Sequence, residues 1–251
     1  MQPKATLEDT LTLMRDLRRR CDWDAAQTHD SLRPYLIEEA HELDDALRDS
    51  DPSKTREELG DVLLQVLFHS VIAEEKGEFD AGDVASGLIA KMHKRHPHLY
   101  GDGERVPWEQ MKASQRTSIE EGLPSGLPAL HRAHRLQDRA AGVGFDWNDV
   151  QGPLEKVSEE LHEVRTLVDQ RSSKDELEAE LGDLLFAVVN LCRKADVHAA
   201  LALDKANAKF VRRFTGIEQL AAERGIDVAT AGLAVLDRLW DEVKASEANS
   251  R

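Results

Sequence analysis

The amino-acid sequence predicts an all-α protein made of two related helical bundles. Apolar residues recur every three or four positions along most of the 251 residues, which is the period of an amphipathic helix. The sequence has no convincing stretch of alternating apolar and polar residues that would predict a strand. An ordered set of acidic, basic and tryptophan residues also occurs twice, about 120 residues apart, which indicates duplication of one helical unit.

The first half is expected to contain five helical segments. Two amphipathic helices are marked by Leu7, Leu11, Met14 and Leu17, and by Leu36, Ala40, Leu43 and Leu47. A turn at residues 51–53 follows, with Ser53 as the expected N-cap of a third helix that has a broad apolar face from Leu59 to Val71. A fourth helix runs from about Ala81 to His96 and ends near Pro97, because proline does not fit a helix interior. Trp108 begins a fifth, short helix.

A cluster of helix-breaking residues at 122–128, Gly-Leu-Pro-Ser-Gly-Leu-Pro, predicts the linker between the two units. The expected domains are therefore residues 1–121 and 129–251. In the second half, two further amphipathic helices are marked by Leu154, Val157, Leu161, Val164 and Val168, and by Leu177, Leu181, Leu184, Leu185 and Val188. Helices then continue through Phe210 and Phe214 and end within residues 228–248. Pro34 and Pro153 stand at matching places, each expected shortly before its acidic helix.

Composition narrows the classes of function. A formal net charge of −15 and a pI near 5.1 argue against a nucleic-acid partner and against an anionic membrane surface, both of which need basic protein surfaces. Cys21 and Cys192 are too few for a disulfide framework and are expected as free thiols in a reducing compartment. The sequence shows no signal peptide and no apolar run of membrane-spanning length. We therefore expect a soluble, cytoplasmic protein.

The repeated acidic residues are the main functional signal. They are Glu38, Glu39, Glu42, Glu58 and Asp61 in the first copy, and Glu159, Glu160, Glu163, Glu180 and Asp183 in the second. Acids three residues apart share a helix face, so two packed helices would bring four carboxylates together. Such a group resists burial unless a cation lies among the carboxylates, and Mg²⁺ is the cation that prefers oxygen ligands, with Mn²⁺ as a substitute. The alternative is that these acids form a solvated helix face with ion pairs. Recurrence of the whole pattern in both halves argues against this alternative.

Basic and aromatic residues follow each acidic set. Lys91 and Arg95 correspond to Lys209 and Arg213, and Trp108 corresponds to Trp240. These cations are either ordinary surface charges or donors that bind phosphate oxygens beside the metal. The tryptophans are either core residues or platforms on which a base stacks. Divalent metal beside phosphate-binding cations predicts phosphate chemistry.

Two other functions are open at this point. Glu38-x-x-His41 and Glu159-x-x-His162 resemble the Glu-x-x-His motifs of ferritin-like diiron proteins, although each lies in its own repeat with its own acids. A non-catalytic acidic adaptor is the second alternative. A local cluster of His93, His96 and His98 has no counterpart in the second half and is expected to cap and solvate a helix end.

With these motifs the chain resembles the MazG family of nucleoside triphosphate pyrophosphohydrolases in its two-repeat bacterial form, over essentially its whole length. The motifs that carry the resemblance, besides the acidic signature, are Arg95-His-Pro-His98, Gly144-Phe-Asp-Trp147, Glu180-Leu-Gly-Asp-Leu-Leu-Phe186 and Lys205-Ala-Asn-Ala-Lys-Phe210. The resemblance implies Mg²⁺-dependent cleavage of a nucleoside triphosphate to monophosphate and pyrophosphate, a homodimer of helical bundles, and a house-cleaning role in the nucleotide pool.

The resemblance also implies roles for individual residues. Metal ligands would be Glu160, Glu163, Glu180 and Asp183, and nucleotide contacts would be Lys156, Lys209, Arg213 and Trp240. Glu159 is the candidate for orienting or deprotonating the attacking water. The second repeat is expected to be the main catalytic unit. The first repeat would assist, with metal ligands Glu39, Glu42, Glu58 and Asp61, and nucleotide contacts Glu38, Lys91, Arg95 and Trp108. Before Trp23, residues 18–21 (Arg-Arg-Arg-Cys) depart from the longer loop of the family.

Overall fold

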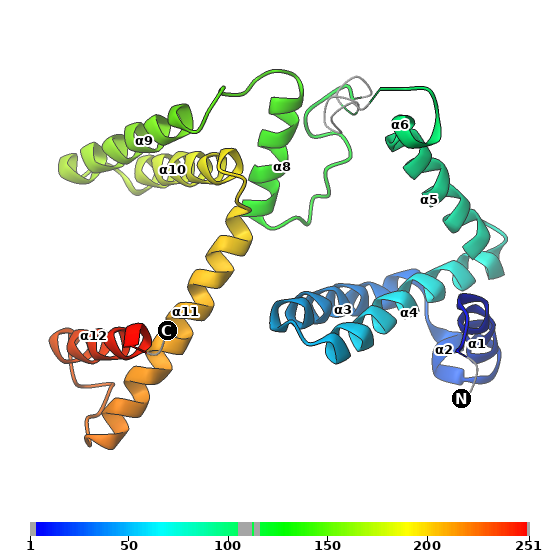
Figure 1. Ribbon diagram of the computed structural model, residues 1–251, viewed down its shortest axis with the longest axis horizontal. Coiled ribbons are helices and arrows are strands. Elements are labelled where there is room, and N and C mark those ends of the chain that lie inside the picture. Colours follow the sequence, from blue (N-terminus) through cyan, green and yellow to red (C-terminus); the bar gives the residue numbers. More distant parts are fainter. Residues whose placement is uncertain (1–3, 105–111, 113–115, 250–251) are drawn as a thin grey trace. The chain divides into compact units, whose positions relative to one another are not determined.

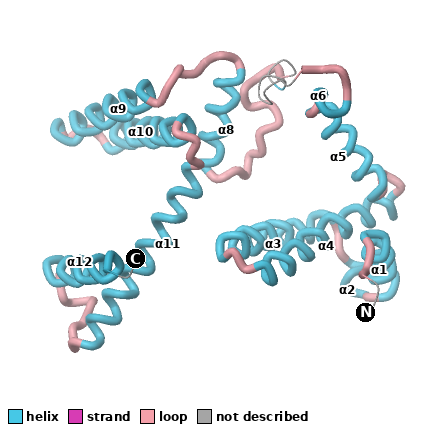
Figure 2. The backbone as a smooth tube through the Cα atoms, viewed as in Figure 1, coloured by secondary structure: helices cyan, strands magenta, loops and turns pink. Residues whose placement is uncertain are grey.

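The computed structural model describes residues 4–104, 112 and 116–249. Helices and connecting loops account for all of this part of the chain, and no strand occurs in it (Figures 1 and 2). The chain divides into two compact units, residues 1–105 and 106–251. The all-α prediction is thus confirmed. Trp108 and the helix expected to begin there lie outside the described residues.

The N-terminal unit is built around a pair of long antiparallel helices. Its elements are α1 (Leu7–Arg20), α2 (Asp22–Ala26), α3 (His29–Asp49), α4 (Pro52–Lys76), α5 (Ala81–Arg95) and α6 (Pro97–Tyr100). The helices α3 and α4 lie side by side, and α1 packs against α4 (Figure 1). The helix α5 ends directly before His96 and Pro97, as the sequence predicts.

Local sequence explains where these helices begin. The side chain of Thr6 accepts a hydrogen bond from the backbone N–H of Asp9, whose carboxylate accepts from Thr6 in return, and Thr28 and Ser31 form the same reciprocal cap for α3. The N-cap of α4 is Asp51 and not Ser53, because Pro52 occupies the first helical position, where no N–H is needed. Pro34 and Pro153 were both expected before their acidic helices, and both lie inside them. Pro34 is the sixth residue of α3, and Pro153 is the third residue of α9 (Gln151–Gln170).

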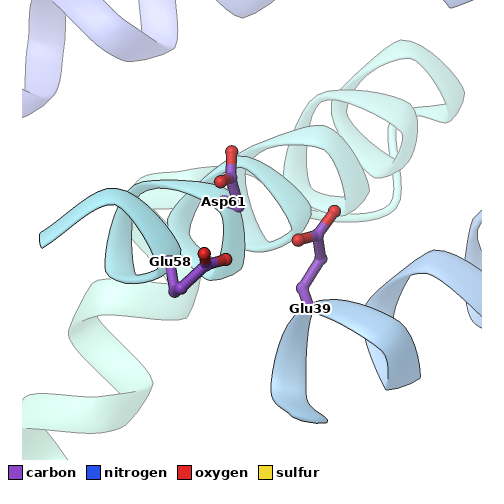
Figure 3. Close-up of side chains that lie close together, drawn as sticks. All are labelled: Glu39, Glu58 and Asp61. Atoms are coloured by element: carbon purple, nitrogen blue, oxygen red, sulfur yellow. The ribbon is translucent and has the colours of Figure 1, made fainter. Parts of the chain in front are cut away.

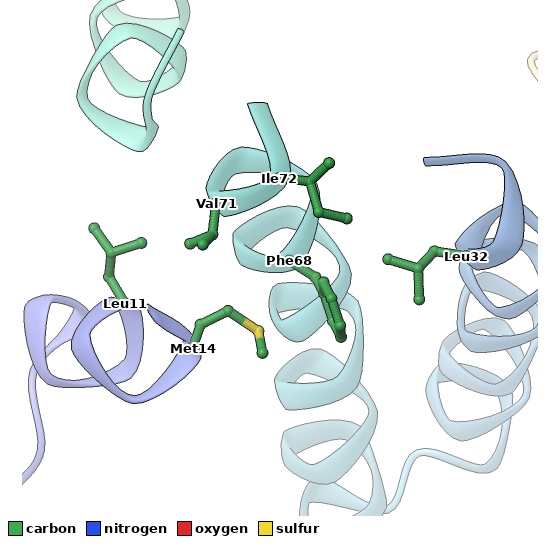
Figure 4. Close-up of a cluster of buried hydrophobic side chains, with 6 residues drawn as sticks. All are labelled: Leu11, Met14, Leu32, Phe68, Val71 and Ile72. Carbon is green, nitrogen blue, oxygen red and sulfur yellow. The ribbon is translucent and has the colours of Figure 1, made fainter. Parts of the chain in front are cut away.

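The core of the N-terminal unit lies at one end of the α3–α4 pair. Leu11 and Met14 from α1 meet Phe68, Val71 and Ile72 from α4, and Leu32 from α3 completes the cluster (Figure 4). Fully burying one such side chain stabilises a fold by about 1.5–3 kcal/mol. Because this core uses the start of α3 and the last half of α4, the acidic residues nearer the α3–α4 turn stay outside it.

The C-terminal unit repeats the paired helices and adds a separate hairpin. Its elements are α8 (Ala129–Gly142), α9 (Gln151–Gln170), α10 (Lys174–Lys194), α11 (Ala199–Glu223) and α12 (Leu233–Asn249). The helices α9 and α10 pack along each other, and α8 packs on α10. The helix α11 contacts α8 and α10 and pairs with α12 over a second core of Ile217, Ala221, Leu239 and Val243.

The segment before α8 is fastened to that helix. Arg139 is 7% exposed, and its Nη1 donates to the backbone oxygens of Ile119 (2.7 Å) and Glu121 (3.0 Å). Arg132 forms an ion pair with Glu120 at 2.7 Å. The linker predicted at residues 122–128 therefore lies inside the second compact unit. In the described part of the chain, none of the helices has the length and apolarity needed to cross a membrane.

Candidate active site

Three carboxylates converge where α9 and α10 pack together. They belong to Glu160 on α9 and to Glu180 and Asp183 on α10, and one oxygen of each lies within 4.8 Å of the others. Glu160 is buried, with 5% of its surface exposed, while Asp183 is open to solvent. We call these three residues the C-terminal acidic group. Three acceptor-only side chains at this distance suit a divalent cation with oxygen ligands.

The N-terminal unit holds a matching arrangement. Glu39 on α3 faces Glu58 and Asp61 on α4, again with oxygens within 4.8 Å of one another (Figure 3). We call these three residues the N-terminal acidic group. Burial raises the pKa of Glu39, and the charges of Asp61 and other nearby acids raise it further. The pKa of Glu58 is raised in the same way, by burial and then by Glu42 and Asp61. Burial and the neighbouring acids therefore both favour the protonated forms of Glu39 and Glu58.

The fourth acid predicted for each set lies beside its group but outside it. Burial and the charges of Glu160 and Glu180 raise the pKa of Glu163, which places its carboxylate near those two. Glu42 acts on Glu58 in the corresponding way. Neither Glu42 nor Glu163 shares the 4.8 Å cluster, since each comes one turn later on its helix than Glu39 or Glu160.

A lysine lies against the C-terminal acidic group. The Nζ of Lys156 is 2.6 Å from Oε1 of Glu160 and 3.0 Å from Oε1 of Glu159. These hydrogen bonds, to Glu160 first, raise the pKa of Lys156 above its ordinary value. Because Glu159 and Glu160 correspond to Glu38 and Glu39, the matching residue of the first repeat is Tyr35.

A cavity of about 700 Å³ adjoins the C-terminal acidic group. Its acidic and basic lining residues are Glu120, Lys156, Glu160, Asp183 and Arg193. The uncharged ones are Ile119, Leu136, Gln137, Ala140, Phe145, Trp147, Pro153, Phe186, Ala187 and Asn190. A mostly apolar cavity of this volume with charged groups to one side is typical of a small-molecule site.

The tryptophan in the cavity lining is held by its neighbours. Asp146 is paired with Arg193 and, at 3.0 Å, with Lys194. Burial alone would raise the pKa of Asp146, but these two cations lower it overall. Trp147 then lies across Gly152, where an added β-carbon would stand 2.0 Å from the indole Cδ1. The position of the Trp147 ring therefore requires glycine at residue 152.

The other predicted nucleotide contacts lie on different surfaces. Nε of Arg213 on α11 donates to Glu247 at 2.9 Å, and its guanidinium lies 5.5 Å from the ring centroid of Trp240 on α12. Lys209 is exposed on the same hairpin. These three residues are not among those that line the cavity. In the first repeat, Lys91 and Arg95 lie on α5, and Trp108 falls outside the described residues.

Two of the buried polar residues in the cavity lining were not identified by sequence reasoning. Gln137 and Asn190 are buried polar residues on α8 and α10. Neither belongs to a repeated motif, and α8 shows only an amphipathic pattern. The only sequence signal for Gln137 is a polar amide within the amphipathic pattern of α8, and such a residue predicts a binding site only weakly.

The histidine alternatives find no support. His41 and His162 belong to neither acidic group, and the groups lie in separate units, each with three carboxylates of its own. In the local cluster, Nδ1 of His96 lies 2.8 Å from the backbone oxygen of Met92 and so caps the end of α5, as expected.

Two related all-α units, each bringing carboxylates together across a pair of packed helices, define a tandem helical protein with two acidic groups. The family model described as "MazG nucleotide pyrophosphohydrolase domain" matches residues 27–100 and again residues 150–216. The chain therefore belongs to this family.

Relatives match nearly all of the chain. A Thermotoga maritima protein named nucleoside triphosphate pyrophosphohydrolase/pyrophosphatase MazG is 43% identical over 250 residues, which cover 96% of each chain. An Escherichia coli K12 protein named nucleoside triphosphate pyrophosphohydrolase is 39% identical over 96% of this chain and 98% of its own length. A Bacillus subtilis protein, YabN, is 43% identical over 95% of this chain and 52% of its own.

Proposed function

We propose that this protein hydrolyses nucleoside triphosphates to the monophosphate and pyrophosphate, with Mg²⁺ as cofactor, and so removes unwanted nucleotides from the cellular pool. One observation carries the proposal: the C-terminal acidic group opens onto a cavity of nucleoside size. Family membership and the names of the relatives support the same reaction.

The carboxylates fit the cation. Glu160, Glu180 and Asp183 supply oxygen ligands, and Glu163 completes the set from the next turn of α9. Mg²⁺, or Mn²⁺ in its place, would neutralise the acids and the triphosphate and polarise the α-phosphorus. Neither acidic group includes a histidine, unlike the mixed glutamate and histidine sites of ferritin-like diiron proteins.

The remaining chemistry falls to side chains beside the acidic group. Glu159 is exposed and adjacent to Glu160, so it can orient the attacking water and accept its proton. Lys156 is held at the cavity by Glu159 and Glu160 and would donate to a phosphate oxygen. The reaction then needs position and charge rather than a covalent intermediate.

We further propose a homodimer. Large apolar residues stay exposed on the α9–α10 pair: Leu154, Leu161, Leu181, Leu185, Phe186 and Val188. Exposed large apolar residues that gather on one pair of helices are typical of a surface that a partner covers. Lys209, Arg213 and Trp240 do not line the cavity of their own chain. In a dimer, the Lys209, Arg213 and Trp240 of the second copy would approach the nucleotide instead. Sedimentation should give twice the 28.1 kDa chain mass.

The N-terminal acidic group is proposed as a weaker, assisting site. Glu39, Glu42, Glu58 and Asp61 would bind metal there, with nucleotide contacts from Glu38, Lys91, Arg95 and Trp108. Tyr35 replaces the lysine of the other repeat and supplies no cation. Nucleotide substrates and the free thiols Cys21 and Cys192 suit the cytoplasm.

Product analysis tests the proposal. Incubation with Mg²⁺ and a nucleoside triphosphate should release pyrophosphate and monophosphate in equal amounts. Glu160→Gln and Asp183→Asn should remove most turnover, and Glu39→Gln should remove less. The matched control is Asp169→Asn on the exposed face of α9. Release of orthophosphate with a diphosphate would contradict the reaction, and equal losses from both repeats would contradict the ranking.

A further inference from the structure

A short segment that precedes the second repeat forms part of the cavity lining. Ile119 and Glu120 line the cavity, whereas the other lining residues come from α8, α9, α10 and the loop between α8 and α9. We call residues 117–121 the strap. The strap lies between the two stretches that match the family model, residues 27–100 and 150–216, and belongs to neither.

The strap is a compact turn held by its own hydrogen bonds. The backbone N–H and the hydroxyl group of Thr117 both donate to the carboxylate of Glu121, at 2.6 Å and 2.9 Å. The backbone N–H of Glu121 donates to the carbonyl oxygen of Ser118 at 3.3 Å. These contacts determine the shape of the strap. Its place beside the cavity depends on contacts with another element.

Two arginines of α8 supply those contacts. Arg132 and Arg139 are two helical turns apart and share one face of the helix. Arg139 is buried, and its Nη1 donates to the carbonyl oxygens of Ile119 at 2.7 Å and Glu121 at 3.0 Å. Hydrogen bonds from a charged donor are stronger than neutral ones, so Arg139 is the main anchor of the strap.

The second arginine acts on the charge of the strap. Arg132 pairs with the carboxylate of Glu120 at 2.7 Å, and both side chains are accessible to solvent. An exposed ion pair contributes little to stability. Because Glu120 lines the cavity, however, the pairing neutralises a negative charge that would repel a polyphosphate.

The anchor holds an apolar side chain that is only half covered. Ile119 is 46% exposed although it lines the cavity and its own carbonyl oxygen is bound by a buried guanidinium. A ligand in the cavity would cover apolar surface of Ile119, and removing such surface from water favours binding. The strap therefore offers a fixed apolar contact to whatever occupies the cavity.

We propose that the strap is the outer wall of the nucleotide cavity, that Ile119 contacts the bound nucleotide, and that Arg139 is the positioning residue that holds the strap in place. This inference rests on the proposed function. It adds that the C-terminal site is incomplete without residues 117–121. Substrate affinity depends on the strap, whereas Mg²⁺ binding and the chemical step depend on the acidic group.

Kinetic measurements on the full chain test the wall. Ile119→Ala should raise KM by about 10-fold and change kcat by less than about 2-fold, because the lost contact is the same in the ground state and the transition state. Val197→Ala is the matched control, since Val197 is 44% exposed and does not line the cavity. It should change neither constant. An unchanged KM in Ile119→Ala would overturn the wall.

A pair of substitutions tests the anchor. Arg139→Met keeps much of the length of the side chain and removes its donors, so KM should rise to a similar extent as in Ile119→Ala. Arg139→Lys restores a cation whose N–H groups can serve both carbonyl oxygens, and it should recover most of the wild-type KM. A lower melting temperature in Arg139→Met with an unchanged KM would show a purely structural role and would overturn the positioning role.

Hydrogen exchange separates this inference from the proposed reaction. Mg²⁺ with an ATP analogue that carries a methylene bridge between the α- and β-phosphates should slow exchange of the strap amides by about 3-fold or more, and Mg²⁺ alone should not. By calorimetry, Ile119→Ala should weaken binding of the analogue and leave Mg²⁺ binding unchanged. These results together with release of orthophosphate from ATP would overturn the pyrophosphohydrolase proposal and leave the strap standing. Pyrophosphate release with unchanged exchange in the strap would overturn the strap alone.

Discussion

The Nζ of Lys156 lies 2.6 Å from Oε1 of Glu160, one helical turn along α9. A cation of the protein itself thus already neutralises one carboxylate of the C-terminal acidic group. In the N-terminal unit, Tyr35 stands at the corresponding position before Glu39, whose pKa is raised by burial and by neighbouring acids. The two repeats share their acids and differ in the cation beside them.

Replacing this lysine should separate metal binding from turnover. Without its ammonium group, Lys156→Met leaves the acidic group more negative, so Mg²⁺ should bind more tightly by calorimetry. Turnover should fall by about 10-fold or more, because a charged hydrogen bond to phosphate is lost. Lys174→Met, at the exposed start of α10, should change neither value. Weaker Mg²⁺ binding in Lys156→Met would contradict this account of the site.

Gly152 should tolerate no side chain. An alanine there would place its β-carbon 2.0 Å from Trp147 Cδ1, so the indole and the loop that carries it must move. We expect Gly152→Ala to destabilise the protein by about 1–3 kcal/mol and to weaken nucleotide binding. Gly87→Ala is the control, because nothing lies within 4 Å of its added β-carbon and alanine favours a helix. Unchanged nucleotide affinity in Gly152→Ala would show that Trp147 is not part of the site.

Binding of Mg²⁺ should weaken in acid. The pKa values of Glu39, Glu58 and Glu163 are raised above the ordinary 4.5, so protons compete for these carboxylates at a higher pH than usual. Metal binds the ionised form, and its affinity must therefore fall as pH drops through the raised range. The rise in melting temperature caused by Mg²⁺ should be large at pH 7.5 and small at pH 5. An effect of constant size would mean that these acids do not bind the metal.

A cluster of imidazoles at the start of α11 should make the fold sensitive to acid. The ring of His198 lies 5.1 Å from that of His131 and 4.6 Å from that of His134, centroid to centroid. Burial lowers the pKa of His131 and of His134, and the facing His198 and Arg135 lower both further, while Asp138 opposes this.

The sign of the pH effect follows from these lowered values. Folded protein binds protons at His131 and His134 less readily than the unfolded chain, so stability is present above about pH 6.5 and is lost as pH falls below it. His134→Gln should reduce the fall in melting temperature between pH 7.5 and pH 5.5. His98→Gln, on the exposed surface of α6, should leave it unchanged. An equal fall in all three proteins would exclude the imidazole cluster as the cause.

Helix-scale features of this protein could be predicted from its sequence. Spacing of three residues places Glu180 and Asp183 on one face of α10, and apolar periodicity pairs that face with α9, so Glu160 meets them. The reasoning works because both steps depend on a regular helix. The prediction was wrong at Ser53 and Pro34. A single residue determines where a helix begins, and the apolar periodicity of the whole helix does not locate that residue.

Features that depend on tertiary packing could not be predicted. Whether Arg213 faces the acids or Glu247 is decided by how α11 and α12 pack, and no spacing in the sequence encodes that. Gln137 reaches the cavity because α8 lies on α10, far from any repeated motif. The repeated motifs predict the acidic group that each helix pair forms by itself. The residues that line the cavity come in part from segments that differ between the two halves, and the repeats do not predict them.

The central claim is that the C-terminal acidic group directs water to the α-phosphorus of a nucleoside triphosphate. Hydrolysis in ¹⁸O-labelled water, followed by phosphorus NMR, measures this directly. The account predicts the label in the nucleoside monophosphate and none in the pyrophosphate, with loss of both products in Glu160→Gln. Label in the pyrophosphate would show attack at the β-phosphorus and would contradict it.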